Sequence, residues 1–311
     1  MFFYFKKAAA LLFLSLAVFS SQVFSKEISV VTTSFPQYDL VRHIVADRAK
    51  VTMLLKPGAD AHSFAPTPKD LIAVEQSSLF VFNGGENDEW IEELISSHKG
   101  DGRFKTFSFV NEVSLLEEET KEGMEQEKDE SEIEETEYDE HVFASLRNDE
   151  IILDKLCQVL SEISPENKEF FRANADDYKE KFAYLDRKYE ELFAKASTRT
   201  LIFGDRFPLL YFVRDYGLDY YAAFKGCSSD TEVSASTVRF LIDKARNLHA
   251  KAIFKIELTN DAVANTVASA AGAKVMVFNS GHNVTVEQFE KGVSLYDLYE
   301  SNLDVLNEAL N

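Results

Sequence analysis

One long amphipathic stretch near the middle of the chain most constrains its fold. Between Pro165 and Ala196, aromatic and leucine residues recur every three or four positions, with Glu and Lys between them. This spacing predicts one continuous helix, which at 1.5 Å per residue is about 45 Å long. Because a helix of that length can span a whole small protein, we expect the rest of the chain to be arranged along it. The apolar positions are Phe170, Phe171, Tyr178, Phe182, Leu185, Tyr189, Leu192 and Phe193.

Short β-branched or aromatic runs alternate with helical patterns on both sides of this helix. Strands separated by helices favour parallel sheets. The sequence therefore predicts an α/β protein with two lobes, each with a mostly parallel sheet flanked by helices, joined by one long rigid helix. The predicted strands are at 28–33, 49–55, 79–83, 200–204, 218–223, 252–257 and 274–278, and the predicted helices are at 38–47, 68–77, 207–215, 234–247, 261–271 and 294–310.

The length and charge of the chain agree with this layout. Its 311 residues are too many for one ordinary hydrophobic core, so we expect an N-terminal lobe at 26–164, the connecting helix at 165–196 and a C-terminal lobe at 197–311. The formal net charge of −20 would repel nucleic acid and an anionic membrane surface. Cations are therefore the expected ligands.

The first 25 residues have the features of an export signal. Lys6 and Lys7 precede an apolar run at 8–19, and Val23-Phe24-Ser25 provides the small-residue spacing of a cleavage site. The apolar run is shorter than the roughly 20 residues that a membrane-spanning helix needs. Since no cysteine near the cleavage site is available to carry a lipid, we expect a soluble periplasmic protein.

An acidic run at 117–140 differs from its surroundings. It contains 14 acidic residues against Lys121 and Lys128. We expect this run to be too polar to pack and therefore to be mobile. It has two interpretations, a solvated linker or a segment that captures cations weakly near a site.

Four candidate metal ligands lie after predicted strands or next to predicted helices. His62 follows the second predicted strand within the proline-rich stretch KPGADAHSFAPTP, which is stiff and suits a preorganised ligand, and His141 follows the acidic run. Asp205 and His282 follow predicted strands of the C-terminal lobe. Such positions allow side chains of both lobes to converge on one cation. Three imidazoles and one carboxylate form a closed tetrahedral set, which suits Zn²⁺ better than Mn²⁺ and favours binding over catalysis.

Asp205 has two structural alternatives to metal binding. It could form an ion pair with Arg206, or it could cap a helix that begins near Phe207. Two other carboxylates are held in reserve. They are Glu232 and Glu257, of which Glu257 could lie behind the ligands.

The remaining histidines and the two cysteines have other interpretations. A single histidine in a helix or polar turn is more often a surface or hydrogen-bonding residue than a ligand. With two cysteines a zinc–thiolate site is not expected, and the sequence leaves open whether they pair. These residues are His43, His98 and His249, with Cys157 and Cys227.

Several stretches of the chain resemble one family of transport proteins. They include SVVTTSFPQYDLVRHI, LLKPGADAHSFAPTPKDL, YDEHVFASL, YFVRDYGLDYYAAF, TEVSASTVRFLID and HNVTVEQFEKGVSLYDLYESNLDVLNEAL. Together they resemble the metal-binding substrate-binding proteins of ABC importers, the ZnuA/TroA-like zinc and manganese group. The similarity covers essentially all of the mature chain.

The resemblance implies two α/β lobes, one connecting helix and one metal between the lobes. His62 matches the first ligand position, His141 the second, and His282 lies at or beside the fourth. The third is usually a histidine or glutamate, but here GDRFPLLYF has Asp205 and Arg206 instead. Zinc-type relatives often have a histidine-rich acidic loop before the second ligand, whereas here the acidic run lacks the histidines.

The resemblance therefore implies a monomeric periplasmic protein that binds a divalent metal, zinc ahead of manganese, and delivers it to an inner-membrane ABC permease. It needs no catalysis, so we expect no enzyme activity. A zinc hydrolase would need an open coordination position and a general base, and no H-E-x-x-H motif is present. A surface adhesin is a third hypothesis, because members of this family have been described as adhesins, but the sequence shows no lipid anchor or surface-sorting signal for it.

Overall fold

The computed structural model describes residues 28–59, 64–85, 88–97, 105–125, 137–226 and 232–311. The predicted export signal at 1–25 lies outside these residues, as do His62, His98 and Cys227. Cys157 is described and is buried.

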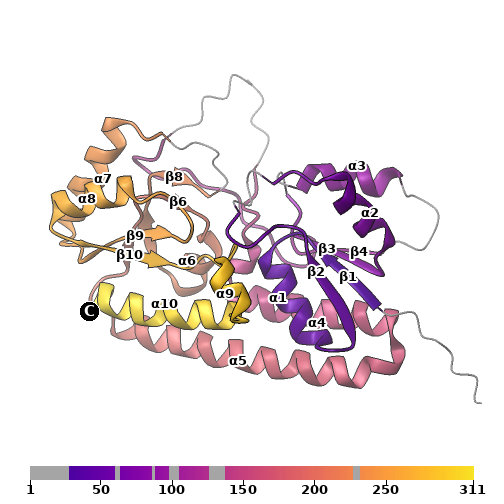
Figure 1. Ribbon diagram of the computed structural model, residues 1–311. Coiled ribbons are helices and arrows are strands. Elements are labelled where there is room, and N and C mark those ends of the chain that lie inside the picture. The colour runs from indigo at the N-terminus through magenta and orange to yellow at the C-terminus, as the bar shows by residue number, and fades with distance from the viewer. Residues whose placement is uncertain (1–27, 60–63, 86–87, 98–104, 126–136, 227–231) are drawn as a thin grey trace, which may run out of the picture.

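The N-terminal half contains one parallel sheet between two layers of helices (Figure 1). Its strand order is β2-β1-β3-β4. Because successive residues of a strand point to opposite faces, Val30 and Val81 pack toward α1 and α4, whereas Val31 and Phe80 pack under α2 and α3. The elements are β1 (Ile28–Thr32), α1 (Phe35–Val45), β2 (Ala49–Met53), α2 (Pro68–Gln76), β3 (Leu79–Phe82), α3 (Glu89–Ser97), β4 (Thr106–Ser108), the 3₁₀ helix η2 (Val142–Ala144) and α4 (Leu146–Ile163).

Helix α1 begins three residues earlier than the sequence predicts. Pro36 occupies its first turn, where a missing N–H has no cost. The backbone N–H of Ser34 donates to Oε1 of Gln37 at 3.2 Å, which satisfies a donor at the start of the helix.

The predicted connecting helix is present as α5 (Lys168–Lys195), preceded by the 3₁₀ helix η3 (Pro165–Asn167). Figure 1 shows α5 running beneath both halves of the molecule, beside α4 and α10 (Leu295–Leu310). Its buried side belongs to one continuous hydrophobic core with residues of both halves. The two halves therefore share a core along α5, which favours small changes in their arrangement over wide hinge opening. The buried side consists of Phe171, Ala175, Tyr178, Phe182, Leu185, Tyr189 and Phe193.

The C-terminal half contains short parallel strand pairs covered by helices. Strand β9 pairs with β10, β5 with β7, and β6 with β8, and a bridge between Phe203 and Phe254 joins the first two pairs. A second core cluster packs α7 and α8 against these strands. The elements are β5 (Thr200–Ile202), β6 (Arg206–Phe207), α6 (Leu210–Tyr216), β7 (Asp219–Tyr221), β8 (Phe224–Lys225), α7 (Ala235–Asn247), β9 (Ala252–Ile256), α8 (Ala262–Ala271), β10 (Lys274–Phe278) and α9 (Val286–Glu290).

The fold class predicted from the sequence is confirmed, with one local difference in the C-terminal half. The predicted helix at 207–215 begins only at Leu210, because Arg206 and Phe207 pair with Phe224 and Lys225 as a short parallel ladder. The chain needs a turn between this ladder and α6, and for this reason the helix starts later than predicted.

Candidate metal site

Two predicted ligands, one from each half of the chain, lie side by side. The ring centroids of His141 and His282 are 4.7 Å apart, with their planes at 80°. The ring of Phe143 lies 5.0 Å from that of His282 and covers it from the side of η2. His141 is 1% exposed, whereas His282 is only partly buried.

The His141 side chain is held by Asp139, two residues earlier. Oδ1 of Asp139 lies 2.9 Å from Nδ1 of the imidazole and also accepts the backbone N–H of His141 at 2.7 Å. The hydroxyl of Tyr211 donates to the carbonyl oxygen of Asp139 at 2.7 Å and fixes this turn against α6. With Nδ1–H donated to the carboxylate, the ring lone pair lies on Nε2, the arrangement found in carboxylate–histidine–zinc groups.

The His282 side chain is held in a similar way by Ser280, also two residues earlier. Nδ1 of His282 lies 3.2 Å from Oγ of Ser280, and the hydroxyl donates to Oε1 of Glu257 at 2.7 Å. The backbone N–H groups of Ser280 and Gly281 donate to the same carboxylate at 2.7 and 3.1 Å. Glu257 follows β9, so this carboxylate joins the loop after β10 to the end of the neighbouring strand.

Acidic neighbours set the protonation of the buried imidazole. Burial lowers the pKa of His141, but the carboxylates of Asp139, Glu140 and Glu118 raise it, and the net effect is a pKa above the ordinary value. Burial also raises the pKa of Glu257 against the hydrogen bonds from Ser280 and Gly281. The carboxylates around His141 favour positive charge at this position, which suits a cation.

Two glycines allow the backbone to approach these side chains closely. Gly281 has φ +89°, and a Cβ there would lie 2.7 Å from the hydroxyl of Tyr299. A Cβ at Gly226 would lie 3.0 Å from Cε1 of His141. Both loops therefore fit against the site only without side chains at these positions.

The loop that leads to His62 is attached to the His282 loop. The side-chain amide of Asn283 donates to the carbonyl oxygens of Lys56 and Ala59 at 3.0 and 2.7 Å. The backbone N–H of Gly58 donates to the carbonyl oxygen of Val284 at 2.7 Å. The N-terminal part of the proline-rich stretch thus contacts the residues beside His282, although His62 itself lies outside the described residues.

The Asp205 carboxylate is engaged with the end of β9. Its Oδ1 accepts the backbone N–H of Arg206 at 2.8 Å, and its Oδ2 accepts the backbone N–H of Ile256 at 3.1 Å and the hydroxyl of Thr259. Burial is the largest influence on the pKa of Asp205 and raises it despite these hydrogen bonds. The structure therefore brings His141 and His282 together, and it shows Asp205 holding the strand that leads to Glu257.

Parts of the acidic run pack against the rest of the molecule, so the expectation that it is too polar to pack is wrong for residues 117–125 and 137–140, of which Asp139 and Glu140 are buried. We call residues 117–125 and 137 the acidic strap. Met124 is buried, and Gly123, at φ +87°, lies against the ring of Phe240. Packing is possible because basic and backbone N–H groups face the acids. The contacts are Glu119–Arg214 at 2.8 Å, Lys121–Asp219 at 2.8 Å, Glu122–Lys244 at 3.1 Å, Glu137–Lys225 at 2.9 Å, Glu118 with the N–H of Gly226 at 3.0 Å, and Glu125 with the N–H of Ser234 at 2.6 Å.

The described residues alone do not complete a metal site. Among them no group of three or more His, Cys, Asp or Glu side chains is arranged to hold a metal ion. The two imidazoles supply two nitrogen donors of the type that Zn²⁺ prefers. The first described part of the proline-rich stretch, which ends at Ala59, contacts Asn283, the residue that follows His282.

The residues that hold the imidazoles were not predicted as such. Asp139 and Ser280 both stand two positions before a histidine, in DEH and SGH, and each contacts Nδ1 of that histidine and accepts a hydrogen bond from its backbone N–H. This common spacing is the sequence signal that could have found them. Glu257 was predicted as a reserve carboxylate that could lie behind the ligands, and it does contact Ser280, which in turn contacts the ring of His282.

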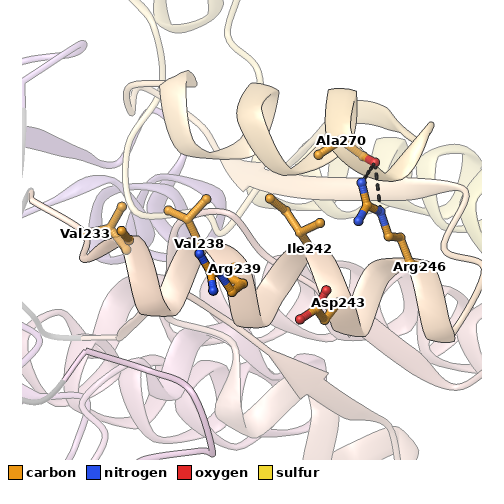
Figure 2. A pocket seen from close by; sticks show the side chains of 8 residues that line it. Val233, Val238, Arg239, Ile242, Asp243, Arg246 and Ala270 are labelled. Carbon is orange, nitrogen blue, oxygen red and sulfur yellow. Dashed lines mark hydrogen bonds between the residues drawn. The ribbon is translucent and has the colours of Figure 1, made fainter.

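A surface groove elsewhere on the molecule has no part in this arrangement. It lies along α7 beside α8, and none of the candidate ligands line it (Figure 2). Arg246, at one end, donates twice to the carbonyl oxygen of Ala270, at 3.0 and 2.8 Å. In the described part of the chain, no helix has both the length and the apolar character to cross a membrane.

Comparisons with known proteins find zinc-uptake and zinc-binding proteins of similar sequence and fold. The chain is 30% identical over 288 residues to the high-affinity zinc uptake system protein ZnuA of Bacillus subtilis, covering 91% of this chain and 88% of that protein. It is 28% identical over 286 residues to the zinc-binding lipoprotein AdcA of Streptococcus pneumoniae, covering 91% of this chain but 56% of AdcA. The crystal structure of the Zn(II)-bound ZnuA-like domain of that AdcA has a TM-score of 0.76 at 26% identity, covering 92% of this chain and 99% of that domain.

The match to a family model is equally extensive. The model described as ZnuA, zinc-uptake complex component A, periplasmic, matches residues 30–309. This range includes the whole described structure except its first two and last two residues. The chain therefore belongs to the ZnuA family of zinc-uptake complex components.

Proposed function

We propose that this protein binds Zn²⁺ between its two halves and delivers the ion to an ABC permease. The observation that supports this most directly is the contact between His141 and His282, with ring centroids 4.7 Å apart. Each imidazole comes from a different half, and each has its Nδ1 engaged by a neighbouring side chain, which leaves Nε2 to present the lone pair.

His62 supplies the third imidazole in this proposal. It stands three residues beyond Ala59, whose carbonyl oxygen accepts a hydrogen bond from Asn283. Three residues span at most about 10 Å, and we propose that this short span brings His62 to the ion beside His282. One zinc-bound relative, the ZnuA-like domain of AdcA, has the same fold at 26% identity.

Asp205 enters the proposal as a candidate fourth ligand. To bind the metal, its carboxylate must leave the N–H of Ile256 or the hydroxyl of Thr259. The alternative is a water molecule that completes three imidazoles. Asp205→Asn decides between these: an unchanged zinc affinity assigns the fourth position to water, and a loss of tenfold or more, in a variant with unchanged stability, assigns it to Asp205.

Membership of the family supports a proposed partner and location. We propose that the protein acts in the periplasm as a monomer, after removal of residues 1–25, and that both lobes, 26–164 and 197–311, contact the permease. Its task is capture and release of an ion, so no enzyme activity is proposed. Imidazole donors favour zinc over manganese.

Elemental analysis and a zinc titration test the proposal. Protein purified without added metal should contain one zinc per chain, and competition with a chelator should show tight binding that His141→Ala and His282→Ala each reduce by at least a hundredfold. His249→Ala is a matched control, because His249 lies two residues beyond the end of α7 and precedes β9, whereas Glu257 and the site follow the other end of that strand. Bound manganese in place of zinc, or parent-like affinity in both variants, would contradict the proposal.

A further inference from the structure

We propose that Glu257, acting through the hydroxyl of Ser280, selects the tautomer and the orientation of His282 that can bind a metal. This inference rests on the proposed function, because it assigns positioning roles to two residues behind a proposed ligand. It concerns residues that make no contact with the metal in the proposed site.

We call the hydrogen-bonded series Glu257, Ser280 and His282 the relay. The hydrogen bonds around Glu257 define the direction in which protons are donated along it. Its carboxylate faces three donors: the hydroxyl and the backbone N–H of Ser280, both at 2.7 Å, and the backbone N–H of Gly281 at 3.1 Å. Backbone N–H groups can only donate, so the carboxylate is fixed as an acceptor. The carboxylate thus takes the single hydroxyl proton of Ser280.

The hydroxyl oxygen of Ser280 is then an acceptor toward His282. It lies 3.2 Å from Nδ1 of the ring and 3.4 Å from the backbone nitrogen of the same residue. Since its only proton is given to Glu257, the contact with Nδ1 requires a proton on Nδ1. A neutral imidazole protonated at Nδ1 has its lone pair on Nε2, and Nε2 is the atom that then binds a metal.

Burial makes this selection effective. Ser280 is 0% exposed, so its hydroxyl is shielded from solvent where it contacts the ring. Gly281, at φ +89°, lets the backbone between Ser280 and His282 turn so that its N–H also reaches Glu257. The relay therefore ties the ring of His282 to the residue that follows β9, and not only to its own loop.

The two imidazoles of the site are thus oriented by different means. His141 contacts the carboxylate of Asp139 directly, at 2.9 Å. His282 reaches its carboxylate through a serine hydroxyl, so removal of the hydroxyl alone separates the ring from the acid while the backbone bonds to Glu257 remain. This makes Ser280→Ala a specific test of the relay.

The experiment uses the mature protein without metal and the same protein titrated with zinc. Long-range ¹H–¹⁵N NMR spectra at about pH 8, where an ordinary imidazole is neutral, report the tautomer of His282. We expect the Nδ1–H tautomer in the parent, a shift toward Nε2–H in Ser280→Ala and Glu257→Gln, and a zinc affinity about 10- to 100-fold weaker in both variants. Glu257→Gln is nearly isosteric and provides a second test should Ser280→Ala fold poorly.

Ser145→Ala is the matched control. Ser145 is also buried and also donates its hydroxyl to a carboxylate, Asp215, at 2.5 Å. It should change neither the tautomer nor the zinc affinity. Parent-like tautomer and affinity in both Ser280→Ala and Glu257→Gln would overturn the relay. A parent that binds no zinc would instead overturn the proposed function, and the tautomer measured without metal would still test the relay.

Discussion

The side-chain amide of Asn283 donates a hydrogen bond to the carbonyl oxygen of Ala59 at 2.7 Å. This bond joins the loop after β2 to the loop after β10, and so joins the two halves of the chain at the candidate site. Asn283 is 2% exposed, and its second bond, to the carbonyl oxygen of Lys56, holds the same loop. The position from which the chain continues toward His62 is therefore fixed by the neighbour of His282.

Asn283→Asp should weaken zinc binding by tenfold or more. The change keeps the shape of the side chain but replaces two donated hydrogen bonds with repulsion between a carboxylate and two carbonyl oxygens, at a cost of about 1–3 kcal/mol. Chelator competition measures the affinity. Asn174→Asp is the control, since Asn174 on α5 also donates to a carbonyl oxygen, that of Ile44, at 3.0 Å. Equal zinc affinities for the two variants would show that the bridge to Ala59 has no role in binding.

Gly281→Ala should reduce both stability and zinc affinity, whereas Gly272→Ala should reduce stability alone. Both glycines have positive φ, +89° and +75°, so both substitutions add backbone strain of about 1–2 kcal/mol. An added Cβ has open space at position 272 but lies 2.7 Å from the hydroxyl of Tyr299 at position 281. Urea unfolding of the two variants measures the backbone strain that both share. Zinc titration measures the displacement of the His282 loop, which only Gly281→Ala should cause. Loss of zinc affinity in Gly272→Ala, or none in Gly281→Ala, would contradict this account.

Much of the fold could be predicted because its strands are short runs bounded by turn residues. Strand β10 has the predicted bounds, Lys274–Phe278, because Val275, Val277 and Phe278 form an apolar run between Gly272 and Asn279. Helix α5 could be predicted from the spacing of its own apolar residues. The later start of α6 could not be predicted, since it depends on the pairing of Phe207 with Lys225, which is set by the tertiary structure.

The candidate site was predictable in outline but not in its hydrogen bonds. That His141 and His282 lie near each other follows from the rule that ligands bind at strand ends. The bonds of Asp205 to Ile256 and Thr259 depend on how β5 and β9 are joined, which no local pattern reports. The packing of the acidic strap depends on basic residues about 100 positions away, such as Arg214.

Asp149→Asn should stabilise the protein at neutral pH. Asp149 is 0% exposed, and neither of its carboxyl oxygens has a hydrogen-bond partner among the residues that the structure describes. Burial, with the charge of Asp39 next, raises its pKa well above the ordinary value. Above about pH 3.9 the unfolded state loses the proton of Asp149, whereas the native state keeps it. The free energy of unfolding of the parent therefore falls by up to about 1.4 kcal/mol per pH unit until the pH reaches the native pKa.

Urea unfolding of Asp149→Asn and the parent between pH 4 and 8 measures this effect. The advantage of the variant should be small at about pH 4 and should grow as the pH rises, because asparagine has no proton to lose. A difference between the two proteins that stays constant with pH would show that Asp149 is ionised in the native state.

Asp39→Asn should have the opposite effect. Burial raises the pKa of Asp39, but His43, Arg42 and the hydroxyl of Tyr178 outweigh it and lower the pKa below the ordinary value. Ionised Asp39 therefore stabilises the native state above about pH 3.9, and this stability is lost as the pH falls through its native pKa. At pH 7 the variant should lose about 3 kcal/mol, because Arg42 loses a charged partner at 2.7 Å. A parent-like free energy of unfolding at pH 7 would contradict this assignment.

The acidic strap should contribute to stability through charge, whereas the neighbouring acids at 126–136 should not. Replacing Glu119, Glu122 and Glu137 with glutamine removes ion pairs to Arg214, Lys244 and Lys225, and should cost about 1–2 kcal/mol in total. Replacing Glu127, Glu130 and Glu134 removes the same charge from a part that the sequence predicts to be solvated, and should change the free energy of unfolding by less than about 0.5 kcal/mol.

Salt and zinc distinguish this interpretation from a metal-capture role for the run. The difference in stability between the two triple variants should shrink at about 1 M NaCl, where charges more than about 3 Å apart are screened. Both variants should keep the zinc affinity of the parent, because carboxylates hold Zn²⁺ more weakly than the imidazoles do. Equal stabilities at low salt would show that the ion pairs contribute nothing, and a large loss of zinc affinity in either variant would place part of the acidic run in the metal site.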